Sequence, residues 1–507
     1  MLRSLRGFLC FSSHKTSDNP DSTPATQENA NRLRFLHKTA AKTRVAGHSP
    51  QKQDTTPPRA QPVSPLTGTD STRGSTSASE AETKPTELSA ATERLSSSSE
   101  APAKSGRLSS LDTSTPYIPI LQRDGSLRPP QVSFDGYGSF GGQFAPESIM
   151  GFLYKLTSFF EATVSDPSFW AEYATFQRPR ATRLQAAEKL TNLAGGATIW
   201  LKREDQNDYG SHKTRNIIGQ LLLARRMGRS EIVTDCASAK HGNFTAAMCA
   251  RLGLRCVVVM GADDAHAQQE DVLEMKLLGA KVLTARAPSG MGTLRAAITE
   301  ALRYSVCNHE TTYYLMSSPV GPSPLPTLVR TFQALLGEEV AAQMHDAAGG
   351  LPDAVVTAVG SGSGAIGLFR PFLQHSATRL VGVEAAQAAA LTEGEMGVLQ
   401  GARTLLLQNR DGQILDSHSI SPDMNLSTVG PEVAHWKDCG RIEMLTATDA
   451  DALDGFKTLQ HHEGILPGLD SSHAVGKAVD LARELGPGKN LVLLVTGCDN
   501  LDMRGLV

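Results

Sequence analysis

Two short segments of this 507-residue sequence carry residues that could together do chemistry on a phosphorylated aldehyde. Lys213 stands directly before an apolar, helical run at 217–224. A buried lysine amine can form a Schiff base with an aldehyde. The second segment follows an apolar, strand-like run at 353–359 and consists of Gly360, Ser361, Gly362, Ser363 and Gly364. A glycine-rich turn at a helix N-terminus offers N–H groups to a phosphate, so the pair favours pyridoxal phosphate (PLP), which carries both groups.

Each segment also has an ordinary explanation. A lysine that opens a helix is most often a solvated surface charge. A glycine-serine segment after a strand is often a tight turn that binds nothing. Neither segment decides between these alternatives by itself.

The elements that must position these residues alternate along the chain. After residue 130, short apolar runs rich in β-branched residues alternate with longer helical patterns, among them 216–227, 242–251 and 327–343. This alternation predicts α/β architecture with mostly parallel, doubly wound sheets. Two such blocks, 179–330 with Lys213 and 331–507 with the glycine-serine segment, predict two domains with the ligand between them.

The first 115 residues have a different composition. They are rich in Ser, Thr, Pro and Gln and contain only three aromatic residues, so they are predicted to be a disordered extension. Arg3, Arg6 and Lys15 precede the first acidic residue, Asp18. This is typical of a transit peptide, which would direct the protein to mitochondria or plastids. A dispensable tail on a cytoplasmic enzyme is the alternative.

The overall composition narrows the classes of partner. The net charge of −3 gives no electrostatic reason to expect nucleic acid or an anionic membrane, and no apolar run is long enough to span a bilayer. The seven cysteines form no C-x-x-C pair and are expected to be reduced thiols. Zinc-ligand spacing is not found, and the adjacent His461 and His462 do not share a helix face, so no metal site is predicted.

From about residue 130 onward, the chain resembles the β chain of tryptophan synthase, a family of fold-type II PLP enzymes. The motifs that carry the resemblance keep the family's order and are FGGQFAPE at 140–147, LKRED at 201–205, GSHK at 210–213, VGP at 320–322, GVEAA at 382–386, EGILP at 463–467 and SSHA at 471–474. The resemblance implies the fold-type II arrangement, with PLP between the two domains. It also implies that residues 116–178 pack mainly with the second block.

The resemblance assigns cofactor roles to particular residues. Lys213 would form the Schiff base and later move the α-proton, and His212 would lie beside the phosphate, which the segment 360–364 would bind. Thr496 would face the pyridine nitrogen with a hydroxyl, which leaves the ring largely neutral. Asp470 replaces a glutamate near the ring.

The segment that the family uses for substrate departs from the family pattern. Asp235 replaces the catalytic glutamate; it is either an acid/base group or a helix N-cap. Lys240 replaces a glutamine and either binds a substrate carboxylate or turns outward. Asn425 replaces an aspartate that contacts the substrate side chain, and Ser317 replaces a glycine. The substrate-binding residues implied are Cys236, Ala237, Ser238, Ala239, Lys240, His241 and Asn425.

Three functions fit these residues. The first is tryptophan synthase β activity, in which L-serine and indole give L-tryptophan and water. The second is a related PLP lyase that uses another nucleophile or eliminates serine to pyruvate. The third is a catalytically silent paralogue. The resemblance further implies a homodimer, a separate α chain, and the monovalent cation that several members bind.

Overall fold

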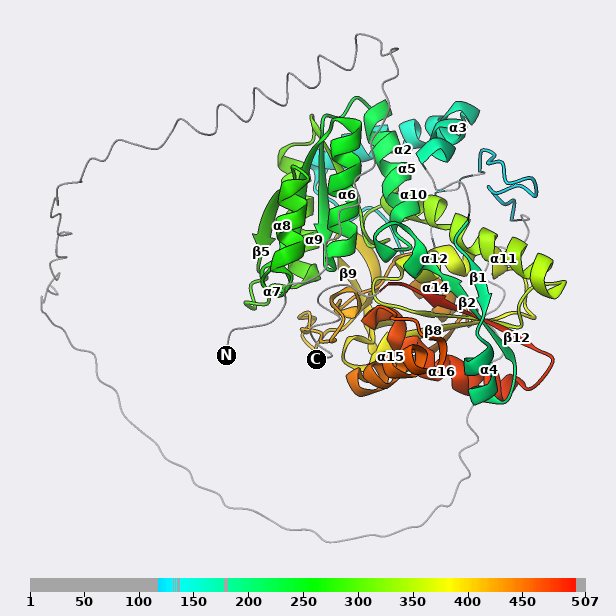
Figure 1. The fold of residues 1–507 in the computed structure, drawn as a ribbon. Helices are drawn as coiled ribbons and strands as arrows, with labels where there is room; N and C mark the ends of the chain where they lie inside the picture. The colour runs from blue at the N-terminus through cyan, green and yellow to red at the C-terminus, as the bar shows by residue number, and fades with distance from the viewer. Residues whose placement is uncertain (1–116, 131, 133, 135–136, 177–180, 498–507) are drawn as a thin grey trace, which may run out of the picture. The chain divides into compact units, whose positions relative to one another are not determined.

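The structure is a computed structural model, and it describes residues 117–130, 132, 134, 137–176 and 181–497. The predictions for residues 1–115 lie outside the described residues. The described residues form α/β layers (Figure 1).

Most strands of the structure lie in two sheets. A six-stranded sheet has the order β1-β2-β12-β7-β8-β11, and a four-stranded sheet has the order β5-β4-β3-β6. All neighbours are parallel except β1 and β2. A separate antiparallel hairpin is formed by β9 and β10. The strands are β1 (Leu184–Ala186), β2 (Thr198–Arg203), β3 (Glu231–Cys236), β4 (Arg255–Gly261), β5 (Lys281–Ala285), β6 (Thr312–Leu315), β7 (Ala354–Ala358), β8 (Arg379–Ala385), β9 (Glu395–Leu399), β10 (Ala402–Leu406), β11 (Glu443–Ala447) and β12 (Asn490–Val495).

Helices connect and cover these strands. They are α2 (Glu147–Val164), α3 (Pro167–Phe176), α4 (Glu188–Ala194), α5 (Thr214–Arg226), α6 (Ala239–Leu252), α7 (Ala262–Ala267), α8 (Gln269–Leu277), α9 (Leu294–Cys307), α10 (Leu325–Gln333), α11 (Leu335–Ala348), α12 (Ser363–Leu368), α13 (Ala390–Glu393), α14 (Pro431–Asp438), α15 (Asp449–Glu463) and α16 (Leu469–Leu485). The parallel strands with helical crossovers confirm the predicted α/β fold class.

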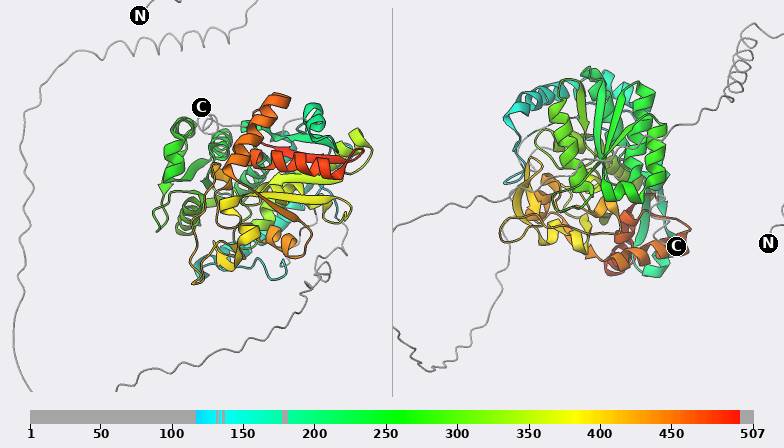
Figure 2. Two further views of the ribbon diagram at one scale, coloured as in Figure 1. Left: turned by 90° about the horizontal axis from the view of Figure 1, so that it is seen from below. Right: turned by 90° about the vertical axis from the view of Figure 1, so that its left-hand side faces the viewer.

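The six-stranded sheet has a hydrophobic core on each face. Side chains alternate along β12, so Leu491 and Leu493 pack with α4, α15 and α16, whereas Val492 and Leu494 pack with α11, α12 and α14. Figure 2 shows the helices on either side of this sheet. A parallel sheet buried on both faces explains why its strands are nearly continuous apolar runs.

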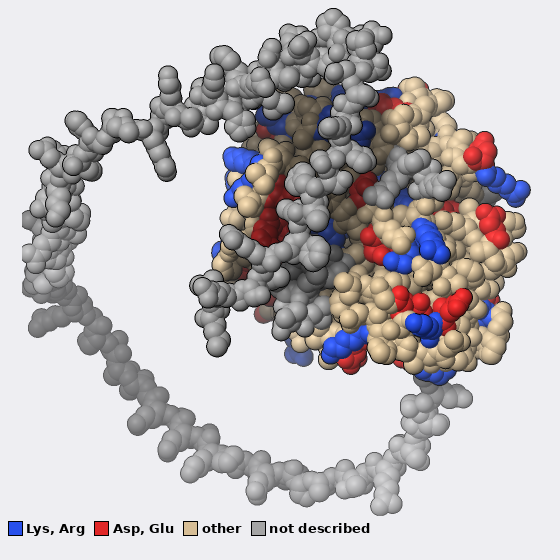
Figure 3. All heavy atoms as spheres, viewed as in Figure 1, with Lys and Arg blue, Asp and Glu red and all other residues tan. Residues whose placement is uncertain are grey.

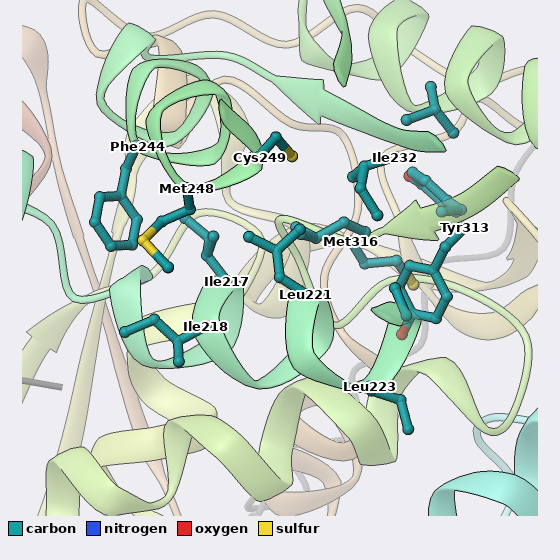
Figure 4. Packing of buried hydrophobic residues seen from close by; sticks show 14 of the residues in the cluster. Ile217, Ile218, Leu221, Leu223, Ile232, Phe244, Met248, Cys249, Tyr313 and Met316 are labelled. Atoms are coloured by element: carbon teal, nitrogen blue, oxygen red, sulfur yellow. The ribbon is translucent and has the colours of Figure 1, made fainter. Parts of the chain in front are cut away.

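The four-stranded sheet shares one large core with α5, the helix that follows Lys213. Residues 214–224 of α5 are all buried. Figure 4 shows Ile217, Ile218 and Leu221 of α5 beside Phe244 and Met248 of α6. Since α5 is enclosed on all sides, the residue before it is held in a fixed place.

The structure differs from the predicted domain boundaries in two places. The block 179–330 does not form a single sheet, because β1 and β2 belong to the six-stranded sheet, where β2 pairs with β12. Helices α2 and α3, which we expected to pack mainly with the second block, share a core cluster with α5 and the four-stranded sheet. The Tyr173 hydroxyl of α3, for example, donates to the backbone carbonyl of Arg215 on α5 at 3.0 Å.

Local element predictions differ mostly at element ends. The helix predicted at 327–343 is two helices, α10 and α11, which meet at Ala334. Strand β7 lies within the apolar, strand-like run at 353–359. Among the described residues, no helix has the length and apolar character needed to cross a membrane. On the face seen in Figure 3, basic and acidic side chains are interspersed among the described residues.

Candidate active site

A pocket brings together residues that are far apart in the sequence. They come from the start of α5, the turn between β7 and α12, the short 3-10 helix η6 (Pro422–Met424), and α16. The lining residues are His212, Lys213, Ala358, Gly360, Ser361, Ser363, Gly364, Asp423, Met424 and Asp470. The lysine and the glycine-serine segment therefore share one pocket, as the sequence predicts.

Lys213 is buried at the N-cap position of α5, with 6% of its surface exposed. This excludes the alternative of a solvated surface lysine. Its Nζ lies 2.8 Å from Oδ1 of Asp423. Burial alone would lower the pKa of Lys213, but the charge and hydrogen bond of Asp423 outweigh burial and raise it.

The backbone of the glycine-serine turn has the conformation of a ligand-binding turn. Gly362 adopts a left-handed conformation, with φ of 94°, at the N-cap of α12. A Cβ on Gly360 would stand 2.1 Å from the carbonyl oxygen of Asp423. Both positions thus require glycine, and the turn stays open toward Lys213.

His212 lies against this turn. Its Nε2 is 3.0 Å from the hydroxyl of Ser363, and its Nδ1 is buried without a hydrogen-bond partner among the described residues. Burial first, and the charge of Lys213 second, lower the pKa of His212 to about 4, so the imidazole is neutral at physiological pH. A free ring nitrogen, an open glycine turn, a serine hydroxyl and a buried lysine in one pocket fit PLP.

At the other end of the pocket, Thr496 and Asp470 are linked. The Thr496 backbone N–H donates to the Ser471 hydroxyl, and the hydroxyls of these two residues lie 2.8 Å apart. The Thr496 hydroxyl in turn donates to Oδ1 of Asp470 at 2.5 Å. Asp470 lines the pocket, and Thr496 lies directly behind it. The proton of Thr496 is therefore directed to a carboxylate, which the sequence did not indicate.

Asp235 is fully buried near the end of β3 and does not line the pocket. The Tyr314 hydroxyl donates to its Oδ1 at 2.8 Å, and the Ser317 hydroxyl donates to its Oδ2. Burial raises the pKa of Asp235, although these hydrogen bonds oppose the effect. The N-cap alternative is wrong, because Ser238 occupies the N-cap position of α6.

The segment from Cys236 to His241 makes its hydrogen bonds within the protein. The Ala239 N–H donates to the side chain of Gln268, and Gln268 donates back to the carbonyl of Ala237, both at 2.8 Å. The Cys236 thiol donates to the Ser238 carbonyl. His241 is buried, and its Nε2 lies 2.8 Å from the Thr234 hydroxyl. In this structure, the segment offers few free groups to a substrate.

Lys240 and Asn425 also lie outside the pocket lining. The Nζ of Lys240 donates to the carbonyl of Gly497 at 2.6 Å, so the side chain turns inward, contrary to the outward alternative. Asn425 follows η6, and its side-chain oxygen accepts a hydrogen bond from Ser417 at 2.8 Å.

Three residues that contact the predicted site were missed. Asp423 contacts Lys213, Gln268 holds the segment after β3, and Tyr314 binds Asp235. Asp423 lies two positions before Asn425, to which the resemblance gives a substrate contact. An acidic residue so close to it could have been predicted to lie in the site. Gln268 and Tyr314 had no signal in the sequence.

The fold and the pocket together define the class of PLP-dependent α/β enzymes. Residues 175–497 match the family described as "Pyridoxal-phosphate dependent enzyme", and the chain belongs to this family. PLP is therefore its cofactor, as predicted.

Within this class, the chain is similar to the tryptophan synthase of Saccharomyces cerevisiae. The two are 44% identical over 381 residues, which cover 73% of this chain and 54% of the yeast protein. This match confirms the predicted resemblance, and the chain spans about half the length of this curated relative.

The crystal structure of a pyridoxal 5'-phosphate-dependent aspartate racemase is similar in fold. The TM-score is 0.51 at 18% identity, and the match covers 64% of this chain and 92% of the racemase chain. At this identity, the likeness concerns the fold alone.

Proposed function

We propose that this protein joins L-serine to indole, giving L-tryptophan and water with PLP as cofactor. The observation that carries the proposal is the pocket in which the buried Lys213 faces the glycine-serine turn. The similarity to yeast tryptophan synthase supports this reaction over the other reactions of PLP enzymes. In the overall reaction, the C–O bond at the serine β-carbon breaks and a C–C bond to indole forms.

The residues of the pocket have distinct tasks in this proposal. PLP, held through its aldehyde by Lys213, would supply an electron sink for the amino acid. The backbone N–H groups of the turn at 360–364, with the Ser361 and Ser363 hydroxyls, would bind its phosphate. The neutral His212 would contact the phosphate through its Nδ1, which has no hydrogen-bond partner among the described residues. Thr496 and Asp470 would bind the ring end.

Lys213 and Asp235 would carry out the proton transfers of the reaction. Lys213 would take the proton from the serine α-carbon when its Nζ is released as an amine. Asp235, whose pKa is raised by burial, would act as the acid/base group for the departing serine hydroxyl. Lys240, on the segment from Cys236 to His241, would attract the substrate carboxylate from its inward position.

The test is to assay the purified, PLP-loaded protein with L-serine, with and without indole. Tryptophan formation that depends on indole, and is lost in Lys213→Ala, is the expected result. Pyruvate or a different β-substituted product, without tryptophan, would reject the proposal in favour of a related lyase. A visible absorption band of lysine-bound PLP that is unaffected by Lys213→Ala would reject the assignment of the lysine.

The assembly of the enzyme remains a prediction from the family resemblance. We propose a homodimer that receives indole from a separate α chain, with a monovalent cation bound as in several relatives. Light scattering with and without K⁺ would determine the oligomeric state and its dependence on the cation.

A further inference from the structure

Asp423 places a carboxylate in the PLP pocket for which the family resemblance provides no role. Its Oδ1 lies 2.8 Å from Nζ of Lys213, and the two side chains are only 16% and 8% exposed. Two opposite charges at this distance, largely withdrawn from water, attract each other far more strongly than a surface pair does. The contact therefore affects the protonation of Lys213, the lysine that is proposed to bind the cofactor.

The backbone holds Asp423 in this position. Its carbonyl oxygen packs directly on the glycine-serine turn, where a Cβ on Gly360 would stand 2.1 Å away. The two residues after Asp423 are also held, because the Met424 N–H donates to the Ser421 carbonyl and the Asn425 N–H donates to the Pro422 carbonyl. The carboxylate thus approaches Lys213 from a segment that is itself part of the cofactor cradle.

Titratable groups from several elements surround this pair. Asp470 on α16 raises the pKa of Lys213 further, in addition to Asp423, whereas burial raises the pKa of the nearby Cys236 thiol on β3 and favours its uncharged form. Burial by itself would raise the pKa of Asp423, but the charge of Lys213, followed by that of Lys240 on α6, outweighs it and lowers the pKa to about 2.

Four other titratable groups also interact with the pair. Asp264 on α7 feels the charge of Asp423. Asp235 on β3 and His241 on α6 feel the charge of Lys213, and His212 acts on both Lys213 and Asp423. Among the described residues, Asp423 is the acidic residue whose ion pair with Lys213 is direct. The charge state of Lys213 is thus controlled chiefly by Asp423.

We propose that Asp423 is a positioning residue that holds the Lys213 nitrogen protonated and oriented in the cofactor-free pocket. This proposal rests on the proposed role of Lys213. Only an unprotonated amine has the electron pair that attacks an aldehyde carbon; the new C–N bond forms as the aldehyde oxygen leaves as water. The proton on the lysine must first pass to solvent, so capture of PLP becomes coupled to the loss of one proton.

The test measures protonation of Lys213 directly, without cofactor or substrate. The cofactor-free full-length protein is treated with trace acetic anhydride between pH 7 and 11, and acetylation of each lysine is followed by mass spectrometry. The pH midpoint reports protonation independently of access, because access changes the rate at all pH values alike. In Asp423→Asn we expect the midpoint of Lys213 to fall by roughly 1 to 3 pH units.

A matched control is available on the protein surface. The Nζ of Lys457 lies 3.8 Å from Oδ1 of Asp454, and both side chains are well exposed, so acetylation of Lys457 in the same samples serves as the surface reference for the Asp423 variants. Asp423→Ser provides a second removal of the carboxylate if the Asn variant is poorly folded, and Asp423→Glu should restore part of the shift. An unchanged Lys213 midpoint in a folded Asn or Ser variant would overturn the proposal, whatever the outcome of the tryptophan assay.

Discussion

The cofactor side and the substrate side of this site differ in where their polar groups point. On the cofactor side, the turn at 360–364 and the end of α5 present Lys213 and the serine hydroxyls to a pocket. On the proposed substrate side, Asp235 at the end of β3 and the segment after β3 bond within the protein, as in the bonds of Asp235 to Tyr314 and of Ala239 to Gln268. The proposed cofactor site is preformed, whereas under the proposed function the segment from Cys236 to His241 would exchange internal hydrogen bonds for contacts with substrate.

The largest effect is expected when Asp235 is substituted. This change tests whether a residue of the proposed substrate side takes part in the reaction. In Asp235→Asn we expect kcat for tryptophan formation to fall by about 10²-fold or more, since a positioned acid/base group is lost. PLP absorbance should stay unchanged because Asp235 lies outside the pocket lining.

Ser317→Ala is the matched control for this change. It removes one donor to the Asp235 carboxylate and leaves the carboxylate itself in place, so a much smaller fall in kcat is expected. Full activity of the Asn variant would mean that Asp235 is only structural.

On the cofactor side, Gly360→Ala should damage the preformed pocket. The new Cβ would meet the Asp423 carbonyl at 2.1 Å, and the backbone must shift. Overpacking of this kind costs about 1–3 kcal/mol, which corresponds to a roughly 5- to 150-fold weaker affinity for PLP if the cost falls on binding. Equilibrium titration with PLP measures the change.

A matched glycine lies on α16. A Cβ on Gly476 would meet no atom within 4 Å, so Gly476→Ala should bind PLP normally. Equal PLP affinity in the two alanine variants would contradict the close contact between Gly360 and Asp423.

A smaller effect is expected from substitution of Gln268, which is hydrogen-bonded to the segment from Cys236 to His241. Gln268→Ala removes the hydrogen bond from the Ala239 N–H and those to the carbonyls of Ala237 and Asp264, each of which contributes about 1 kcal/mol. We expect a lower unfolding temperature and a change in KM for serine of several-fold, with PLP affinity unaffected. If PLP affinity changes as much as KM, the two sides are not independent.

The smallest effects concern the two buried histidines, one on each side of the site. Burial, followed by the charge of Lys213, lowers the pKa of His212 to about 4 and that of His241 to about 3. The unfolded chain binds these protons at higher pH, with an ordinary histidine pKa of about 6.5. Their contribution to stability is therefore complete above that value and is lost as the pH falls.

At pH 5, each histidine is expected to lower the free energy of unfolding by about 2 kcal/mol relative to pH 7. His241→Asn should make the free energy of unfolding, measured with urea, less dependent on pH between 7 and 5. A variant with the same pH dependence as the unmodified protein would show that His241 is not buried as a neutral ring.

Much of the site could be predicted from short motifs. Lys213 and the turn at 360–364 were predicted together because a Schiff-base amine and a phosphate-binding turn both suit PLP, and the family resemblance assigned them these roles. The domain boundary at 179 was misplaced, because β2 pairs with β12, almost 300 residues later, and local patterns do not encode the choice of a distant partner. The packing of α2 and α3 was missed for the same reason.

By itself, the sequence determined the α/β class, the glycines at 360 and 362 and the lysine that meets them, because these depend on local periodicity and backbone freedom. Only the tertiary structure decided which groups satisfy one another. It paired Lys213 with Asp423, 210 residues away, and enclosed Asp235 between Tyr314 and Ser317. Burial and the distance between charges set the protonation of these groups, and both arise only when the chain has folded.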